Sequence, residues 1–232
     1  MPIMQNPWLN VKPGDPIKMA DGDDNTLVNF INNSIDKDLK DWPEPYMGDR
    51  NANVYLLNAN PARNLDLNDG WEDPDYDTIM QNNLQHKPTA DKHPFVFFND
   101  IEVNTTVGKI PLGGCKWWQK RTAQLRKELE LEPNFFVVEY FPYRTDNAKD
   151  IPDPQTLAKT KSYQYANQLI EDAMAAGKII VIMRMKEKWL SRIPGLADYR
   201  KLYQLVNTRQ AWITEGNISK ISGTWEDLKA AL

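Results

Sequence analysis

Hydrophobic residues in this chain gather in short, uninterrupted runs, and the segments between the runs show helical spacing. Four runs are predicted to be strands, over residues 53–58, 134–141, 178–184 and 203–207. Because these runs are apolar at consecutive positions, both faces of each strand should be buried, which is typical of a parallel sheet covered on both sides. The pattern therefore predicts an α/β fold, with three α/β/α layers around a mainly parallel sheet of four or five strands.

Apolar positions three or four residues apart predict the helices of this fold. They place one helix from about Asp24 to Trp42, one after Gly114 to about Leu129, and one from Pro154 to Gly177. Asp153 before Pro154 supplies a good helix start, as does the capping box at Thr224 and Asp227. A short helix over residues 186–192 completes the set.

The remaining segments are polar or irregular. Residues 1–23 are rich in Pro, Gly and Asp and are predicted to form a loose arm, so that residues 24–232 form a single domain. Residues 61–93 form a long polar stretch, and a loop of that length in a compact chain is usually functional or mobile. Residues 93–100 contain a strand-like aromatic run, which can also be a loop packed against the core.

Composition narrows the class of protein. The net charge is −4, so no global basic field indicates a nucleic-acid partner, and any DNA contact needs a local basic patch. Cys115 is the only cysteine, which excludes an intrachain disulfide and a cysteine-ligated metal site. Neither a signal peptide nor an apolar run of about 20 residues is present. We therefore expect a cytoplasmic protein with no membrane segment, no metal cluster and no cofactor.

Polar residues end three of the predicted strands. Asn58 and Asn60 follow the first strand, Glu139 and Tyr140 end the second, and Asn207 ends the fourth. Parallel sheets bind ligands at the carboxyl ends of their strands, so these side chains are expected to meet at one site.

The segments Asn58-Ala59-Asn60-Pro61-Ala62 and Asn207-Thr208-Arg209 resemble two motifs of the uracil-DNA glycosylase superfamily. The first keeps the central Asn-Pro of the mismatch-specific branch without its flanking glycines, and the second keeps the Asn without the following Pro. The order of elements agrees over roughly residues 50–220, and the chain also looks like bacterial proteins of unassigned role with this fold. The resemblance implies a DNA repair hydrolase that excises a flipped base.

The same resemblance implies roles for individual residues. Cleavage of an N-glycosidic bond needs a positioned water and a donor to the departing base. Asn60 would hold the water, and Asn207 would donate to the base, so both are catalytic candidates. The candidate substrate-binding residues are Asn58, Phe97, Phe98, Glu139, Tyr140 and Arg209, with a phenylalanine ring stacking on the flipped base and Glu139 or Tyr140 in place of a base-reading Asn.

Basic residues supply the candidate DNA contacts. Arg63 and Arg144 follow strand ends, while Lys116 and Lys120 share one face of a predicted helix, a pattern that can track a phosphate backbone. The acidic stretch over residues 66–77 would repel DNA if it flanked the same surface.

Each of these residues also has a structural interpretation. Asn60 and Asn207 can cap their own turns, the phenylalanines can be core, and the basic residues can be a solvated surface. Two alternatives to the glycosylase therefore stay open. One is a glycosylase-like fold without catalysis that binds a nucleotide, nucleic acid or protein partner. The other is an unrelated α/β hydrolase of small substrates, although the chain lacks Gly-x-Ser-x-Gly and phosphate-loop motifs.

Overall fold

In the computed structural model, the hydrophobic runs form one five-stranded sheet in the order β1-β5-β2-β6-β7. The model describes residues 3–27, 30, 41–61, 74–87, 92–99, 102–105, 108–111, 113–145, 148–219 and 223–232. The sheet strands are β1 (Tyr46–Gly48), β2 (Val54–Leu57), β5 (Phe136–Val138), β6 (Ile179–Ile182) and β7 (Leu202–Gln204). β5, β2, β6 and β7 are parallel, and β1 pairs antiparallel with β5 at the edge.

β2 occupies the centre of the sheet, and every one of its residues is buried. Leu57 lies opposite Val138 of β5 on one side and Ile182 of β6 on the other. The predicted α/β class is thus confirmed, and the four strands read from the sequence are present with shorter bounds.

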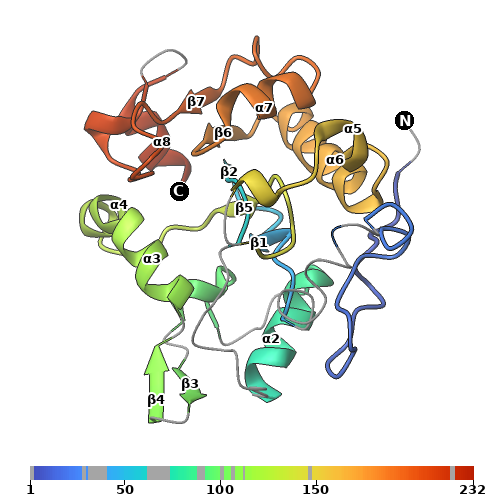
Figure 1. Cartoon of the computed structure of the whole chain (residues 1–232). Coiled ribbons are helices and arrows are strands. Elements are labelled where there is room, and N and C mark those ends of the chain that lie inside the picture. Colours follow the sequence, from blue (N-terminus) through green and yellow to red (C-terminus); the bar gives the residue numbers. More distant parts are fainter. Residues whose placement is uncertain are drawn as a thin grey trace.

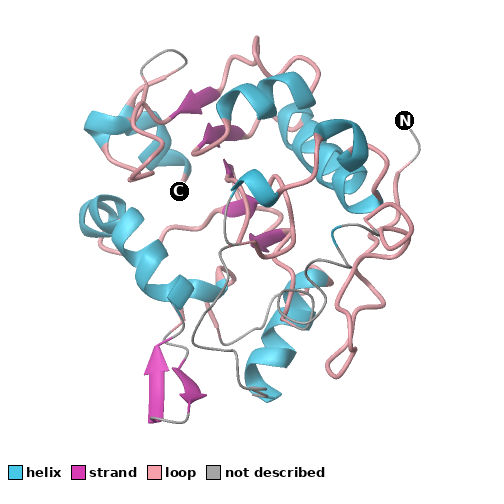
Figure 2. Cartoon of the chain, viewed as in Figure 1, coloured by secondary structure: helices cyan, strands magenta, loops and turns pink. Residues whose placement is uncertain are grey.

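Helices lie on both sides of this sheet (Figure 1). α6 lies on one side, while α3, α4 and α8 lie on the other, and Figure 2 shows how irregular segments connect them. The α-helices in the described part of the chain are α2 (Pro74–Leu84), α3 (Gly113–Arg121), α4 (Ala123–Leu129), α5 (Pro154–Leu157), α6 (Lys161–Ala175), α7 (Lys186–Arg192) and α8 (Trp225–Ala231). Short 3₁₀ helices lie at η2 (Val96–Phe98), η3 (Ala148–Asp150) and η4 (Glu215–Asn217).

Several helix predictions are confirmed at their ends. Asp153 caps α5 by accepting hydrogen bonds from the backbone N–H groups of Gln155 and Thr156, with Pro154 in the first turn. The capping box of Thr224 and Asp227 opens α8. The predicted helix from Pro154 to Gly177 is instead two helices, because Thr160 interrupts it and caps α6.

Other predictions are wrong. The aromatic run at residues 93–100 contains the 3₁₀ helix η2 in place of a strand. α2 lies within the stretch that was predicted to be a long polar loop. A small antiparallel hairpin of β3 (Glu102–Thr105) and β4 (Gly108–Pro111) was not predicted at all, and neither was β1. The predicted helix from Asp24 to Trp42 falls largely outside the described residues.

The N-terminal segment is irregular, as predicted, but it is not loose. Between residues 3 and 27 it has no helix or strand, yet the Trp8 side chain is fully buried. Asp23 is also buried and accepts hydrogen bonds from the Tyr143 hydroxyl and from the backbone N–H of Lys161 and Ser162. These contacts attach the segment to the sheet connections and to the start of α6.

Candidate functional site

Three neighbouring parallel strands end in polar side chains at one edge of the sheet. Asn58 follows β2, Glu139 follows β5, and Arg184 follows β6 by two residues. Backbone hydrogen bonds hold these ends in register, from Asn58 N–H to Val138 O at 3.0 Å and from Met183 N–H to Leu57 O at 2.8 Å. The convergence predicted for the carboxyl edge is therefore present for Asn58 and Glu139.

Asn58 and Glu139 form a buried polar pair. The amide Nδ2 of Asn58 donates to Glu139 Oε1 at 2.9 Å, and each residue is only 6% exposed. The indole N–H of Trp189, on α7, donates to the backbone oxygen of Asn58 at 2.9 Å and fixes this end of β2. The other two polar atoms of the pair, Asn58 Oδ1 and Glu139 Oε2, are buried without a hydrogen-bond partner among the described residues. Buried polar atoms are rarely left without a hydrogen-bond partner, so these two atoms are available to form hydrogen bonds with a ligand.

Burial changes the protonation of Glu139. Desolvation raises the pKa of its carboxyl group to about 8, because the charged form is disfavoured away from water, and the nearby Glu44 adds to the effect. The hydrogen bond from Asn58 and the charge of Arg184 act in the opposite direction. At neutral pH the group is therefore mainly protonated, so Oε2 can act as a hydrogen-bond donor.

Asn60 lies two residues beyond Asn58, with its amide nitrogen engaged. Nδ2 donates to the backbone oxygen of Pro61 at 3.0 Å and to Thr145 Oγ1 at 2.9 Å. An amide nitrogen carries two hydrogens, so both are used, and the side chain is fixed with Oδ1 as its remaining polar atom. This geometry is compatible with the predicted role of Oδ1 as an acceptor for a water.

Two arginines flank an indole beside this edge. The guanidinium carbons of Arg121 and Arg184 lie 4.7 and 5.5 Å from the ring centroid of Trp117, on α3. The Nε atoms of both arginines are buried and have no hydrogen-bond partner in the described part of the chain. Burial and the neighbouring Arg184 lower the pKa of the Arg121 guanidinium. Two like charges held together in this way form a candidate anion site.

Sequence reasoning missed this arginine pair, although a signal for it was present. Arg184 follows a buried strand, and the same rule that drew attention to Arg144 applies to it. Arg121 is on the helix that carries Lys116 and Lys120, but its contact with Trp117 depends on tertiary packing.

Asn207 does not join the pair or Asn60 in a common hydrogen-bond network. It is exposed, and its Oδ1 accepts a hydrogen bond from the backbone N–H of Gln210 at 3.3 Å. Asn217 holds the same loop, since its side chain bonds both the N–H and the oxygen of Asn207. Asn207 therefore stabilises its own turn, which favours the structural interpretation over the predicted catalytic one.

The predicted stacking residues are part of the core. Phe97 and Phe98 are buried, and Phe98 packs against Phe95 and Phe135. Tyr140 is buried against Trp189 and Arg192. The stacking role predicted for Phe97 and Phe98 is wrong for this arrangement, because both rings are buried in the core. The side chain of Tyr140, which was predicted to read the base, is buried as well.

The predicted DNA contacts fall into different environments. Arg144 is buried, and its guanidinium forms ion pairs with Asp41 at 2.7 Å and with Glu44, so the predicted phosphate contact is wrong. Lys116, Lys120 and Arg209 are exposed, as a surface contact requires. Arg63 lies outside the described residues.

The described residues contain no group of three or more His, Cys, Asp or Glu side chains that could hold a metal ion. No helix in the part of the chain that the structure describes is long and apolar enough to cross a membrane. Comparisons of the chain with protein-family models, with curated proteins and with solved structures found no match. The function must therefore be inferred from the site.

Proposed function

We propose that this chain is a uracil-DNA glycosylase-like N-glycosidase, with a three-layer α/β/α fold, that removes a base from DNA. The observation that supports the proposal most is the Asn58–Glu139 pair at the carboxyl edge of the sheet, with one unused atom on each residue. Asn58 Oδ1 is an acceptor, and Glu139 Oε2 is a donor while its carboxyl group is protonated. The lactam edge of uracil or hypoxanthine offers the complementary set, one N–H and one carbonyl oxygen.

The proposed reaction consumes one water. Asn60 Oδ1 accepts a hydrogen bond from that water and directs it at the anomeric carbon, while the bond from this carbon to the base nitrogen breaks. The water oxygen forms the new bond to the sugar, and the base leaves with the bonding electrons. Glu139 stabilises the negative charge on the base by hydrogen bonding, and a proton from the water balances the released base.

The remaining parts of the site support an anionic substrate. Arg121 and Arg184 would contact a phosphate beside the flipped nucleotide, since half-buried cations with no ion pair among the described residues favour an anion. Asn58 Oδ1 and Glu139 Oε2 are both buried, so a base reaches them only when the side chains that cover them move aside.

A second candidate is a glycosylase-like fold that binds a nucleotide or nucleic acid without cleaving it. The engagement of Asn207 in its own turn favours this candidate, because it removes the second predicted catalytic group. The two candidates share a binding site and differ in base release.

The deciding experiment measures base release from oligonucleotides. Single-stranded and duplex substrates carrying uracil, hypoxanthine or a mismatch are incubated with the full chain, and abasic sites are detected by alkaline strand cleavage. We expect release from at least one substrate, loss of release in Asn60→Ala, and retention in Asn207→Ala. Binding without release, together with weaker binding by an Arg121→Gln and Arg184→Gln double variant, would select the second candidate. Neither binding nor release would contradict both.

A further inference from the structure

A cavity of about 280 Å³ lies at the amino-terminal edge of the sheet, away from the strand ends that carry Asn58 and Glu139. It forms where the turn after β1, the end of α2 and the segment that precedes and includes η2 meet. Nothing in the proposed glycosidase reaction uses this cavity, and it differs from the carboxyl edge in its chemistry.

Positive charge is in excess around this cavity. Among the residues that the structure describes, its lining includes Arg50, Lys87 and Lys92 but only one carboxylate, Asp49. That carboxylate is already engaged, because its two oxygens accept hydrogen bonds from Asn51 N–H at 2.8 Å and from Asn134 Nδ2 at 3.3 Å. A local excess of cations in a chain of net charge −4 favours an anionic ligand.

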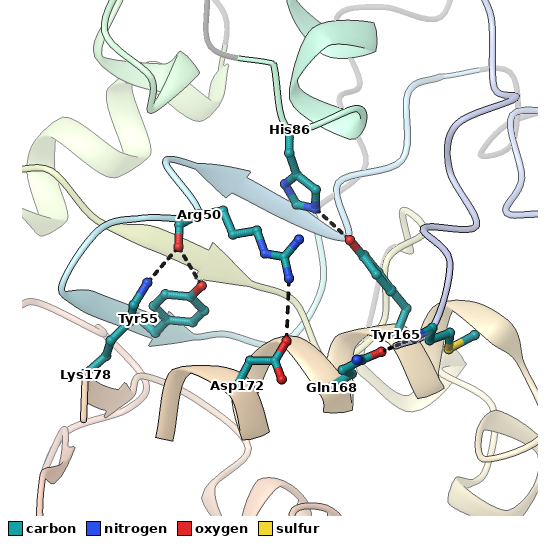
Figure 3. Close-up of polar contacts among 8 residues, drawn as sticks. Arg50, Tyr55, His86, Tyr165, Gln168, Asp172 and Lys178 are labelled. Atoms are coloured by element: carbon teal, nitrogen blue, oxygen red, sulfur yellow. Dashed lines mark hydrogen bonds and ion pairs between the residues drawn. The ribbon is translucent and has the colours of Figure 1, made fainter. Parts of the chain in front are cut away.

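Arg50 is fixed at its backbone while its side chain stays only weakly paired. Its carbonyl oxygen accepts hydrogen bonds from Tyr55 and Lys178, each at 2.8 Å (Figure 3). Its guanidinium lies 3.5 Å from the carboxylate of Asp172, and both side chains are about half exposed. An exposed pair of this kind contributes little to stability, so an anion in the cavity can compete for the guanidinium.

His86 places an unused polar atom beside this charge. Its ring stacks on Tyr46, with centroids 4.3 Å apart, and its Nε2 lies 3.0 Å from the hydroxyl of Tyr165 on α6. Nδ1 is buried and has no hydrogen-bond partner among the residues that the structure describes. The backbone of His86 has a positive φ of 53°, a strained conformation for a residue other than glycine that often marks functional positions.

A second histidine of the lining is held by its ring and by its backbone. Nδ1 of His93 accepts a hydrogen bond from the backbone N–H of Phe95 at 3.1 Å. Asn99 holds the backbone of His93 from both sides, by accepting from its N–H and donating to its oxygen, each at 2.9 Å. The cavity is therefore largely formed before any ligand enters it.

We propose that this cavity binds a small phosphate monoester, with Arg50, Lys87 and Lys92 contacting the phosphate. Three cations from three separate segments suit a dianion better than a single carboxylate, and guanidinium and ammonium groups both form charge-assisted hydrogen bonds with phosphate oxygens. The volume lies just below the range of roughly 300–1,000 Å³ that is usual for drug-sized ligands, so the organic part must be small.

Calorimetric titration of the full chain tests the proposal. The probes are glycerol 3-phosphate, inorganic phosphate and glycerol, in chloride at constant ionic strength. We expect glycerol 3-phosphate to bind, glycerol not to bind, and the Arg50→Gln and Lys92→Gln double variant to bind at least about tenfold more weakly, because the variant loses two charge-assisted hydrogen bonds to the phosphate. Lys159→Gln is the matched control, because Lys159 is exposed elsewhere in the chain.

Three results would overturn the proposal. They are equal binding of glycerol 3-phosphate and glycerol, unchanged affinity in the double variant, and binding of inorganic phosphate as tightly as the monoester. None of them bears on base release at the carboxyl edge, so this inference and the proposed function can fail separately.

The spectroscopic signals of the histidine imidazoles can show where the ligand binds. The chain has two histidines, so its imidazole signals can be assigned with a His93→Gln variant. The groups that face His86 are Arg50, Tyr46 and Tyr165, and burial together with Arg50 lowers the pKa of His86 to about 4. A bound phosphate would offset the charge of Arg50, and we expect it to raise this pKa. Binding that leaves the titration of His86 unchanged would place the ligand outside the cavity and overturn the assignment.

Discussion

Each edge of the sheet holds a titratable side chain that burial keeps uncharged. The side chain at the carboxyl edge is uncharged because it is protonated, whereas the one at the amino edge is uncharged because it is deprotonated. At the carboxyl edge Glu139 keeps its proton, because burial raises its pKa to about 8. At the amino edge His86 is without its second proton, because burial lowers its pKa to about 4. Desolvation is the first cause in both cases, and it always disfavours the charged form, which is the anion of one residue and the cation of the other.

This difference in protonation suits the two edges to different ligands. A protonated carboxyl group can donate a hydrogen bond to a neutral base, which suits the proposed excision site. A neutral histidine beside Arg50, Lys87 and Lys92 leaves the surplus charge to the lysines and the arginine, which suits an anion. The pH dependence of stability should also differ in sign between the edges.

The largest effect on stability is expected when a charged residue that is ion-paired near the carboxyl edge is removed. Arg144→Ala removes the partner of Asp41 and Glu44 and leaves the buried Glu44 and the half-buried Asp41 uncompensated. We expect the free energy of unfolding, measured in urea, to fall by about 3–5 kcal/mol. Arg209→Ala is the control, because this arginine is exposed and its loss should cost no more than about 0.5 kcal/mol. Equal losses in the two variants would contradict the structural role of Arg144.

The next largest effect is expected in the pH dependence of stability, when the wild-type chain is compared with a variant that carries a neutral analogue of Glu139. The native state binds more protons than the unfolded state between the ordinary pKa of 4.5 and the raised pKa of about 8, so stability is greatest at low pH and falls as the pH rises through this window. Glu139→Gln keeps an acceptor for Asn58 and does not titrate. Relative to this variant, the wild-type chain should lose up to about 1.4 kcal/mol per pH unit. Parallel unfolding profiles of the two proteins would show that Glu139 is not buried as described.

The smallest effect has the opposite sign and belongs to the amino edge. The native state resists protonation of His86 between the ordinary pKa of 6.5 and the lowered pKa of about 4, so stability is present above this window and falls as the pH decreases. His86→Asn removes the titration, and Asn tolerates the positive φ at this position. Over this narrower window the wild type should lose up to about 1.4 kcal/mol per pH unit relative to the variant. A wild-type profile that rises on acidification would reverse the comparison of the two edges.

The hydrophobic pattern predicted the central part of the fold because a strand that is buried on both faces has apolar residues at consecutive positions. The runs that contain β2, β5, β6 and β7 are apolar at consecutive positions, and the capping residues Asp153 and Thr224 act locally. β1 left no comparable trace, since it is three residues long and lies among prolines. The aromatic run around Phe97 is buried in the core and does not form the predicted stacking surface, and apolar content alone does not separate a strand from a 3₁₀ turn.

The candidate site was predictable only in part, for a related reason. The rule about carboxyl strand ends located Asn58, Asn60 and Glu139, because each follows a buried run directly. The same rule also selected Asn207 and Arg144. Asn207 instead accepts a hydrogen bond from Gln210 in its own turn, and Arg144 forms ion pairs with Asp41 and Glu44. The rule takes neither kind of contact into account. It could not show that Arg121 and Arg184 share one indole ring.

The central position of β2 has a consequence for how the chain is made. β2 is synthesised before its sheet neighbours β5 and β6, which lie far downstream, and the register of Leu57 with Ile182 requires the chain to be complete to that point. Pairings between distant segments form slowly, because long loops must close first. On the ribosome, Val54–Leu57 is therefore a hydrophobic strand with two unpaired edges, which other chains can occupy. We expect this interval to make the nascent chain dependent on chaperones until β6 has emerged.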